Sequence, residues 1–179
     1  MPRSTRRRAC GGVALALLLA SLAASAGAQT ALERGRYLVE GPVGCGNCHT
    51  PQGPDGPVAG KTLAGGLEFV EPVFKAYASN ITPDRETGIG TWTDAQIIRA
   101  IREGKSPDGT TIGPPMPFML YRDISDTDVA AIVAYLRTVK PVVNKVPRSD
   151  FSKFPLPPAW GPPVGKVADV PRSDKVAWG

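Results

Sequence analysis

Apolar residues recur at helical intervals in three stretches of the chain, and each stretch follows a residue that favours a helix N-cap. In the first stretch, Thr30 and Glu33 have the spacing of a capping box, so a short helix is expected over residues 31–39. The apolar side of this helix is formed by Leu32, Gly35, Leu38 and Val39.

The second helix is expected to begin at Thr93, because Gln96 follows it at capping-box spacing. Gly104 stands where a C-terminal cap is favoured, so the helix should end just before it. Its apolar side consists of Ile97, Ile98 and Ile101.

The third helix has the clearest periodicity in the chain. Ser125 is a favourable N-cap, and Lys140-Pro141 stops the pattern, because the residue before a proline is pushed out of the helical region. Between these limits, apolar side chains fall at i, i+3, i+4 and i+7, namely Val129, Ile132, Val133 and Leu136.

Residues 50–92 join the first two helices and are crowded with glycine and proline. Such a density of helix and strand breakers predicts a long loop rather than a long helix or a regular sheet. A loop of this length is uncommon inside a compact domain. It becomes reasonable if the segment wraps around something other than protein.

The chain changes character after Pro141. The remaining residues contain eight prolines, counting Pro141, and no amphipathic period, which predicts an extended tail lying on the domain or free in solvent. The pentapeptide VPRSD occurs at 146–150 and again at 170–174. Two short copies do not make a repeat architecture, and they are typical either of a solvated linker or of a partner-docking motif.

The N-terminal 28 residues have the features of a secretory signal peptide. An arginine-rich start precedes an apolar run over 13–24, and small residues lead to a cleavage position near Ala28. The run is shorter than the roughly 20 residues that a membrane-spanning helix needs. We therefore expect a periplasmic mature protein without a transmembrane anchor, exported by the general or, through Arg6-Arg7-Arg8, the twin-arginine route.

Signal cleavage also changes the charge balance. The chain has 21 Lys and Arg; the first 28 residues hold four of them and no acidic residue, which leaves 17 against 16 Asp and Glu. A nearly neutral chain lacks the concentrated positive charge that nucleic acid requires, so no nucleic-acid partner is expected. The length suits one domain. The expected division is signal peptide 1–28, folded domain 29–143 and proline-rich tail 144–179.

The chemistry of the mature chain is concentrated in CGNCH, residues 45–49. This stretch contains the only histidine of the chain and, once Cys10 has left with the signal peptide, its only two thiols. Structural zinc usually takes four Cys or His ligands, and no second cluster is present. A thioredoxin-like dithiol belongs in a strand-alternating fold, and a disulfide across so small a loop adds little stability and leaves the histidine without a role.

A fourth interpretation uses all three side chains together. In Cys-x-x-Cys-His, both thiols form thioether bonds to the haem vinyl groups and the adjacent imidazole is directed at the iron. Cys45 and Cys48 are accordingly the predicted attachment points of one haem c, and His49 is the predicted proximal ligand.

A six-coordinate iron needs a second axial ligand, and with no other histidine this ligand would be a methionine. The mature chain offers Met116 and Met119. Met116 lies in GPPMPF, where prolines on both sides restrict the backbone, so it is the predicted distal ligand. Met119 lacks such bracketing and suits core packing.

Two further residues are candidates for contacts with the haem propionates. Trp92 has an indole N–H that a carboxylate can accept, although a core tryptophan is an equal alternative. Asn80 has an amide that can donate to a propionate, or can form an Asx turn.

From about Ala31 to Val143 the chain resembles class I c-type cytochromes. The resemblance rests on the helix with Gly35 and Tyr37, CGNCH, the long loop, the methionine loop and the closing helix with Ala134-Tyr135-Leu136. It implies an all-α class I cytochrome c fold around one covalent haem, in which the first and last helices cross and Gly35 permits their close approach.

More narrowly, YASNITPDRETGIGTWTDAQIIRAIREG followed by PPMPF resembles the haem domains in cytochrome subunits of bacterial periplasmic alcohol and sugar-acid dehydrogenases. Those subunits commonly carry three such domains, whereas this chain has one. The resemblance implies an electron carrier or dehydrogenase subunit rather than an enzyme, with a periplasmic dehydrogenase as donor and a membrane oxidase or another cytochrome as acceptor. The alternative is a haem sensor or peroxidase-like enzyme in which the methionine leaves the iron.

Overall fold

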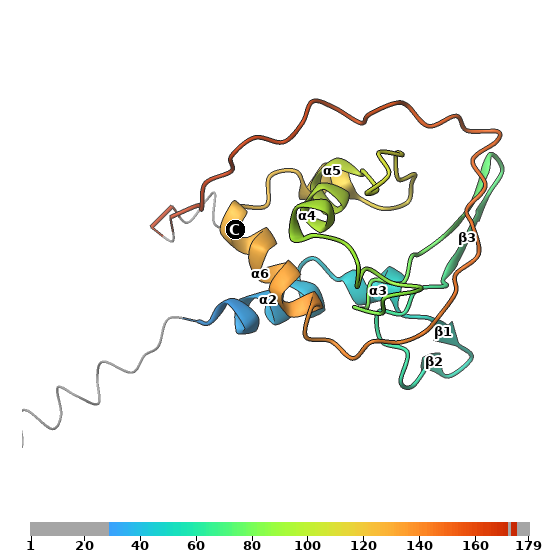
Figure 1. Ribbon diagram of the computed structural model, residues 1–179, viewed down its shortest axis with the longest axis horizontal. Coiled ribbons are helices and arrows are strands. Elements are labelled where there is room, and N and C mark those ends of the chain that lie inside the picture. The colour runs from blue at the N-terminus through green and yellow to red at the C-terminus, as the bar shows by residue number, and fades with distance from the viewer. Residues whose placement is uncertain (1–28, 172, 175–179) are drawn as a thin grey trace, which may run out of the picture.

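Helices supply most of the regular structure, with two small hairpins between them (Figure 1). The computed structural model describes residues 29–171, 173 and 174, so the predicted signal peptide lies outside the described residues. In chain order the elements are α2 (Ala31–Glu40), α3 (Cys45–His49), β1 (Gln52–Gly53), β2 (Gly56–Pro57), β3 (Glu68–Glu71), β4 (Phe74–Tyr77), α4 (Asp94–Glu103), α5 (Phe118–Tyr121) and α6 (Asp126–Leu136).

The three helices expected from periodicity are confirmed as α2, α4 and α6. Thr30 and Thr93 each form the predicted capping box, and Ser125 caps α6 by accepting a hydrogen bond from the backbone N–H of Asp128. Gly104 ends α4 in the left-handed conformation, with φ of 61°. The last helix ends at Leu136, four residues before the Lys140-Pro141 stop.

The all-α expectation missed two antiparallel hairpins. Strands β1 and β2 pair over two residues each, and β3 pairs with β4 from Glu68 opposite Tyr77 to Glu71 opposite Phe74. Both hairpins lie within the segment expected to be one long loop. Their strands are too short to show a period-2 pattern among so many glycines and prolines.

Helices α2 and α6 cross in close contact at Gly35. A Cβ atom at this position would lie 2.0 Å from the carbonyl oxygen of Ala131, so only glycine allows the backbones to approach this far. Beside the crossing, Arg34 donates two hydrogen bonds of 2.7 Å to the carboxylate of Asp128. The family's expected helix crossing is thus present in this chain.

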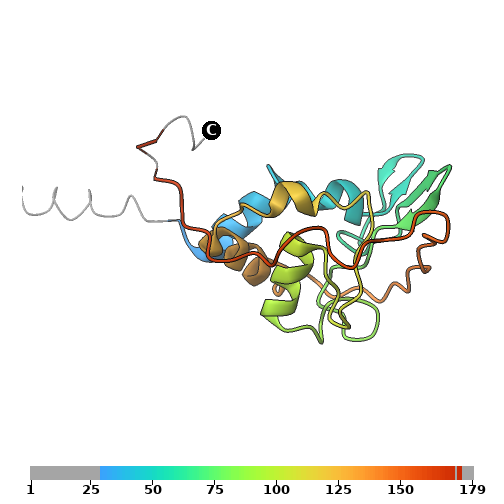
Figure 2. The same cartoon turned by 90° about the horizontal axis from the view of Figure 1, so that it is seen from above.

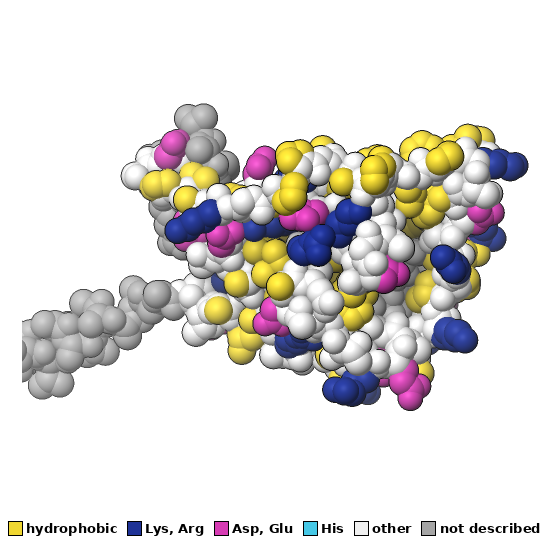
Figure 3. Space-filling model, turned by 45° about the horizontal axis from the view of Figure 1, so that its top comes forward, with side chains coloured by type: hydrophobic (Ala, Val, Ile, Leu, Met, Phe, Trp, Pro, Cys, Tyr) yellow, Lys and Arg dark blue, Asp and Glu magenta, His cyan; other side chains and the backbone are white. Residues whose placement is uncertain are grey.

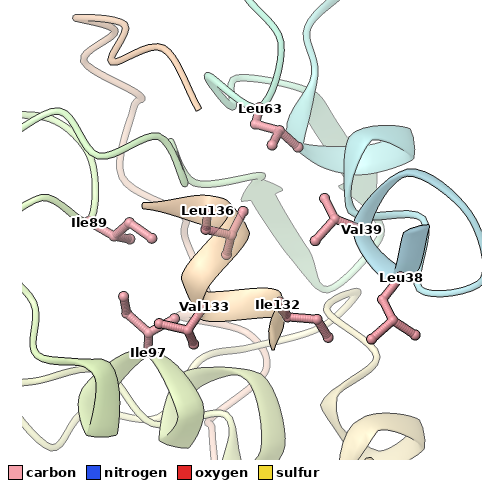
Figure 4. Close-up of a cluster of buried hydrophobic side chains, with 8 residues drawn as sticks. All are labelled: Leu38, Val39, Leu63, Ile89, Ile97, Ile132, Val133 and Leu136. Atoms are coloured by element: carbon pink, nitrogen blue, oxygen red, sulfur yellow. The ribbon is translucent and has the colours of Figure 1, made fainter. Parts of the chain in front are cut away.

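The hydrophobic core lies between this helix pair, α4 and the loop that follows α3 (Figure 4). Ile132 of α6 is fully buried, and Val39 of α2 is only 1% exposed. The buried cluster consists of Leu38, Val39, Leu63, Ile89, Ile97, Ile132, Val133 and Leu136. Cys45 and Trp92 pack against this cluster, which connects the core to the candidate site.

The segment after α6 lies on the domain. Residues 141–171 contain no helix or strand; they leave α6, follow the β3–β4 hairpin and return across the molecule to the start of α6 (Figures 1 and 2). Asp150 exchanges two backbone hydrogen bonds with Lys75, and the carbonyl of Val167 accepts from the backbone N–H of Asp126. We call residues 141–171 the tail.

Charges of both signs are interspersed over the face shown in Figure 3. Lysine and arginine side chains stand beside aspartate and glutamate, with apolar side chains between them. Neither sign of charge therefore occupies this face alone.

The close crossing predicts that Gly35→Ala destabilises the fold. The added methyl group collides with backbone rather than with a movable side chain, so the helices must separate, and overpacking of this kind costs about 1–3 kcal/mol or more. Urea unfolding of both proteins measures the difference in free energy of unfolding. Gly165→Ala is the matched control, because a Cβ there meets no heavy atom within 4 Å. Equal unfolding free energies for Gly35→Ala and the control would contradict the crossing.

Candidate cofactor site

The CGNCH segment forms a short helix, α3, that places both thiols in the wall of one cavity. Gly44 precedes it with φ of 60°, a left-handed conformation that glycine adopts without strain. The three-residue spacing puts Cys45 and Cys48 on the same side of the helical turn, and both thiols are free. The disulfide alternative is therefore not what the structure shows.

His49 ends α3 and presents one ring nitrogen to the cavity. Its Nδ1 lies 2.7 Å from the carbonyl oxygen of Ser79, and because a carbonyl only accepts, Nδ1 carries the proton. The lone pair therefore lies on Nε2, the nitrogen that remains for a metal ion. Burial lowers the pKa of His49, which favours the neutral imidazole that metal binding requires.

The environment of Cys45 differs from that of a redox dithiol. Burial raises the pKa of its thiol to about 11. Catalytic Cys-x-x-Cys motifs have lowered thiol pKa values, because the thiolate is the nucleophile. The thioredoxin-like alternative is therefore disfavoured. Within the described part of the chain, no three or more His, Cys, Asp or Glu side chains are grouped to hold a metal ion, as structural zinc would require.

The cavity has a volume of about 1280 Å³. This exceeds the range of roughly 300–1,000 Å³ that is usual for sites of drug-sized ligands. Apolar side chains from α4, from the loop before it and from α6 form much of the wall, including Ile81, Ile89, Trp92, Ile97, Ile101 and Leu136. A large, mostly apolar group fits such a space.

Of the two methionines in the described chain, only Met116 lines the cavity. Met119 belongs to α5 and is 52% exposed, so its sulfur lies neither in the cavity wall nor in the core. The structure thus brings the sulfur of Met116, the imidazole of His49 and the thiols of Cys45 and Cys48 to one cavity.

Trp92 lines the cavity and packs against the core. Among the described residues, no hydrogen-bond partner is recorded for its indole nitrogen, while its backbone carbonyl accepts a hydrogen bond from Arg137. Its N–H is accordingly available to a carboxylate at the cavity wall.

Asn80 also lines the cavity, but its side-chain amide is fully hydrogen-bonded within the protein. The side-chain oxygen accepts a 3.0 Å hydrogen bond from the backbone N–H of Thr82, which is the Asx turn. The amide nitrogen donates to the carbonyl of Val142 at 2.8 Å and to the hydroxyl of Thr87 at 3.0 Å. Both amide hydrogens are therefore used within the protein, and none remains for a propionate.

Several residues at the cavity were not expected from the sequence. The hydroxyl of Tyr121 donates to the carbonyl of Val43 at 2.9 Å and so connects α5 to the segment before α3. The tail contributes residues between 145 and 158, and together with Lys105 it brings three cationic side chains to the wall, namely Lys105, Lys145 and Arg148. The aromatic residues of the tail were an available signal, because solvated linkers contain few of them.

No helix in the described part of the chain combines the length and the apolar character needed to cross a membrane.

Comparison with known proteins identifies the family of this chain. The family model described as cytochrome c matches residues 32–140. The chain is 43% identical over 133 residues to a nicotinate dehydrogenase subunit of Pseudomonas putida, covering 72% of this chain and 11% of that protein. It is 36% identical over 145 residues to the gluconate 2-dehydrogenase cytochrome c subunit of Pantoea cypripedii, covering 80% of this chain and 31% of that subunit.

A third relative is the cytochrome c subunit of the quinone-type alcohol dehydrogenase of Gluconobacter oxydans, 39% identical over 137 residues. The match covers 75% of this chain and 26% of that subunit. This chain therefore spans between about a tenth and a third of the length of these three relatives.

Proposed function

This chain belongs to the cytochrome c family, and on this premise we propose that it is a monohaem electron carrier that functions with a dehydrogenase. Cys45 and Cys48 would hold one haem c covalently, and His49 and Met116 would bind its iron. The observation that carries the proposal is the meeting of two free thiols, one imidazole and one thioether at a single cavity. The chain contains one histidine, and therefore one Cys-x-x-Cys-His motif.

The residues at the cavity fit a haem group. The haem, when bound, supplies a one-electron ferric–ferrous couple. The carbonyl of Ser79 orients the imidazole of His49, in the way that groups behind a metal ligand commonly do. The apolar wall excludes water, and the indole N–H of Trp92 and the cationic side chains of Lys145 and Arg148 suit the negative charge of the propionates.

The ligand pair raises the reduction potential of the iron. A thioether paired with an imidazole favours ferrous over ferric iron, compared with two nitrogen ligands. The apolar wall acts in the same direction, because low polarity disfavours the additional positive charge of the ferric state. The resulting higher reduction potential suits a protein that accepts electrons from a dehydrogenase.

The relatives support the proposed partner class. They are named as subunits of nicotinate, gluconate and alcohol dehydrogenases. By analogy, this chain accepts electrons from a periplasmic dehydrogenase and passes them to a membrane oxidase or another cytochrome of the respiratory chain. Residues 1–28 serve as the cleaved export signal, residues 29–143 form the haem domain and residues 144–179 form a proline-rich C-terminal segment, which includes the tail from residue 144 onward.

A carrier and a sensor or peroxidase-like enzyme differ in whether the sixth position of the iron is closed. The position of Met116 in the cavity wall favours closure. The reduced wild-type protein is therefore expected not to bind carbon monoxide at neutral pH, as followed by the Soret spectrum. Stoichiometric binding of carbon monoxide would contradict the carrier and support the alternative.

The dehydrogenase partner is tested by purification from the native periplasm at low salt. We expect a dehydrogenase to copurify with the tagged chain and to reduce it when its substrate is added. A matched preparation with Met116→Leu is expected to retain the partner, because the substitution lies inside the cavity, but to be reduced less completely. Recovery of the chain alone, with no periplasmic dehydrogenase able to reduce it, would contradict the proposed partnership.

A further inference from the structure

The methionine loop, residues 113–117, carries Met116 and makes few hydrogen bonds of its own. In the described structure, residues 113–116 make no hydrogen bond to any other part of the chain. The nearest backbone bonds lie on either side, from Ile112 N–H to the carbonyl of Gly104 at 2.7 Å and from Leu120 N–H to the carbonyl of Pro117 at 2.9 Å. What keeps this loop in place must therefore be packing.

Phe151 of the tail packs directly over Gly113. A Cβ atom at Gly113 would lie 2.3 Å from Cζ of the Phe151 ring, so the absence of a side chain makes room for the ring. Phe74 of β4 packs against the Phe151 ring, with the two ring centroids 5.4 Å apart. The ring thus fills the space between the β3–β4 hairpin and the methionine loop.

Trp160 of the tail contacts both ends of the same loop. Its indole N–H donates a 2.8 Å hydrogen bond to the carbonyl of Ile112. Its ring lies 5.2 Å from the ring of Phe118, measured between centroids, and Phe118 is 4% exposed. Residues 112 and 118, which flank the Met116 segment, are therefore both held by one tail side chain.

The tail is anchored to the rest of the fold at points independent of this loop. Before Phe151, Asp150 exchanges backbone hydrogen bonds of 2.9 and 2.7 Å with Lys75 of β4. After Trp160, the backbone N–H of Val164 donates to the carboxylate of Glu103 at 2.9 Å. Because both anchors lie on regular elements, the tail can resist displacement of the loop.

We propose that Phe151 and Trp160 are positioning residues that hold the Met116 loop at the cavity and thereby set how firmly its sulfur occupies the sixth position of the iron. This inference rests on the proposed function, and it assigns the tail a role at the cofactor rather than in solvent. Without either side chain, the loop keeps its prolines but loses packing on one side. The sulfur then competes less well with an added ligand.

Imidazole binding to the oxidised full-length protein tests this role. In Trp160→Leu and in Phe151→Ala we expect the apparent affinity for imidazole to rise about tenfold, which corresponds to about 1.4 kcal/mol. The far-red charge-transfer band of methionine-ligated ferric haem is expected to weaken at lower imidazole concentrations than in the wild type. Thermal unfolding followed by circular dichroism separates these effects from a general loss of structure.

Phe154→Ala is the matched control. Phe154 belongs to the same tail and contacts Phe74, with centroids 6.0 Å apart, and no contact of its ring with the methionine loop is recorded. Its imidazole affinity is expected to stay within about twofold of the wild type. The same affinity in Trp160→Leu, Phe151→Ala and the control would overturn the inference. A wild type without haem or without the methionine band would instead refute the proposed function.

A double-substitution cycle tests the contact from the loop side, and it applies even if Trp160→Leu fails to fold. Gly113→Ala forces the Phe151 ring or the loop to move, so imidazole affinity is expected to rise. In a Phe151→Ala background the same substitution meets no ring and is expected to add no further change. Equal effects of Gly113→Ala in both backgrounds would show that the contact does not position the methionine.

Discussion

Replacing both Cys45 and Cys48 with alanine is expected to abolish covalent attachment of haem to the exported chain. The only other thiol of the chain is Cys10, which lies in the predicted signal peptide, and both Cys45 and Cys48 lie in the cavity wall. With neither present, no thioether bond can form, and any haem that enters the cavity is held only by its axial ligands and by packing. Haem staining of a denaturing gel measures the effect, because only covalently attached haem survives denaturation.

Asn47→Ala is the matched control for the cysteine pair. Asn47 lies between the two cysteines in α3, but it is exposed and does not line the cavity. Its haem stain should equal that of the wild type. A stained band of normal intensity from the double alanine variant would show that haem attachment does not use these cysteines.

Replacing Met116 with leucine is expected to produce the second largest effect. Leucine has a similar volume, so the loop should keep its packing, but it has no sulfur to occupy the sixth position of the iron. The far-red band should disappear, carbon monoxide should bind the reduced protein, and the reduction potential should fall by on the order of 0.1 V. That fall is a fraction of the roughly 0.8 V over which axial ligands tune haem proteins.

Met119→Leu provides the comparison, because it is the same substitution three residues further along the chain. Met119 is 52% exposed and does not line the cavity. The Met119→Leu variant should keep the far-red band and the reduction potential of the wild type, and its reduced form should not bind carbon monoxide. The account of the sixth ligand would be wrong if Met119→Leu lost the band and Met116→Leu kept it.

Local signals in the sequence were sufficient to predict the principal helices. The capping boxes at Thr30 and Thr93 depend on residues only three positions apart, so they can be recognised in the sequence without knowledge of the fold. The same is true of the CGNCH segment, whose chemistry lies within five residues. The helices are confirmed by the structure, whereas the haem chemistry of CGNCH stays a prediction.

Several features were not predicted, and most of them depend on distant parts of the chain. The tail has no periodicity, and its position is set by single side chains that fit spaces made elsewhere, such as Phe151 over Gly113. The commitment of Asn80 to the carbonyl of Val142 joins residues 62 positions apart. The short hairpins pair within a segment in which glycine and proline obscure any strand pattern.

The most direct test of the central claim is the intact mass of the mature, exported protein, measured after denaturation together with its visible spectrum. The account predicts the mass of the polypeptide plus that of one haem, with a Soret band that stays with the protein in acidified organic solvent. A mass equal to that of the bare polypeptide, without Soret absorbance, would contradict it.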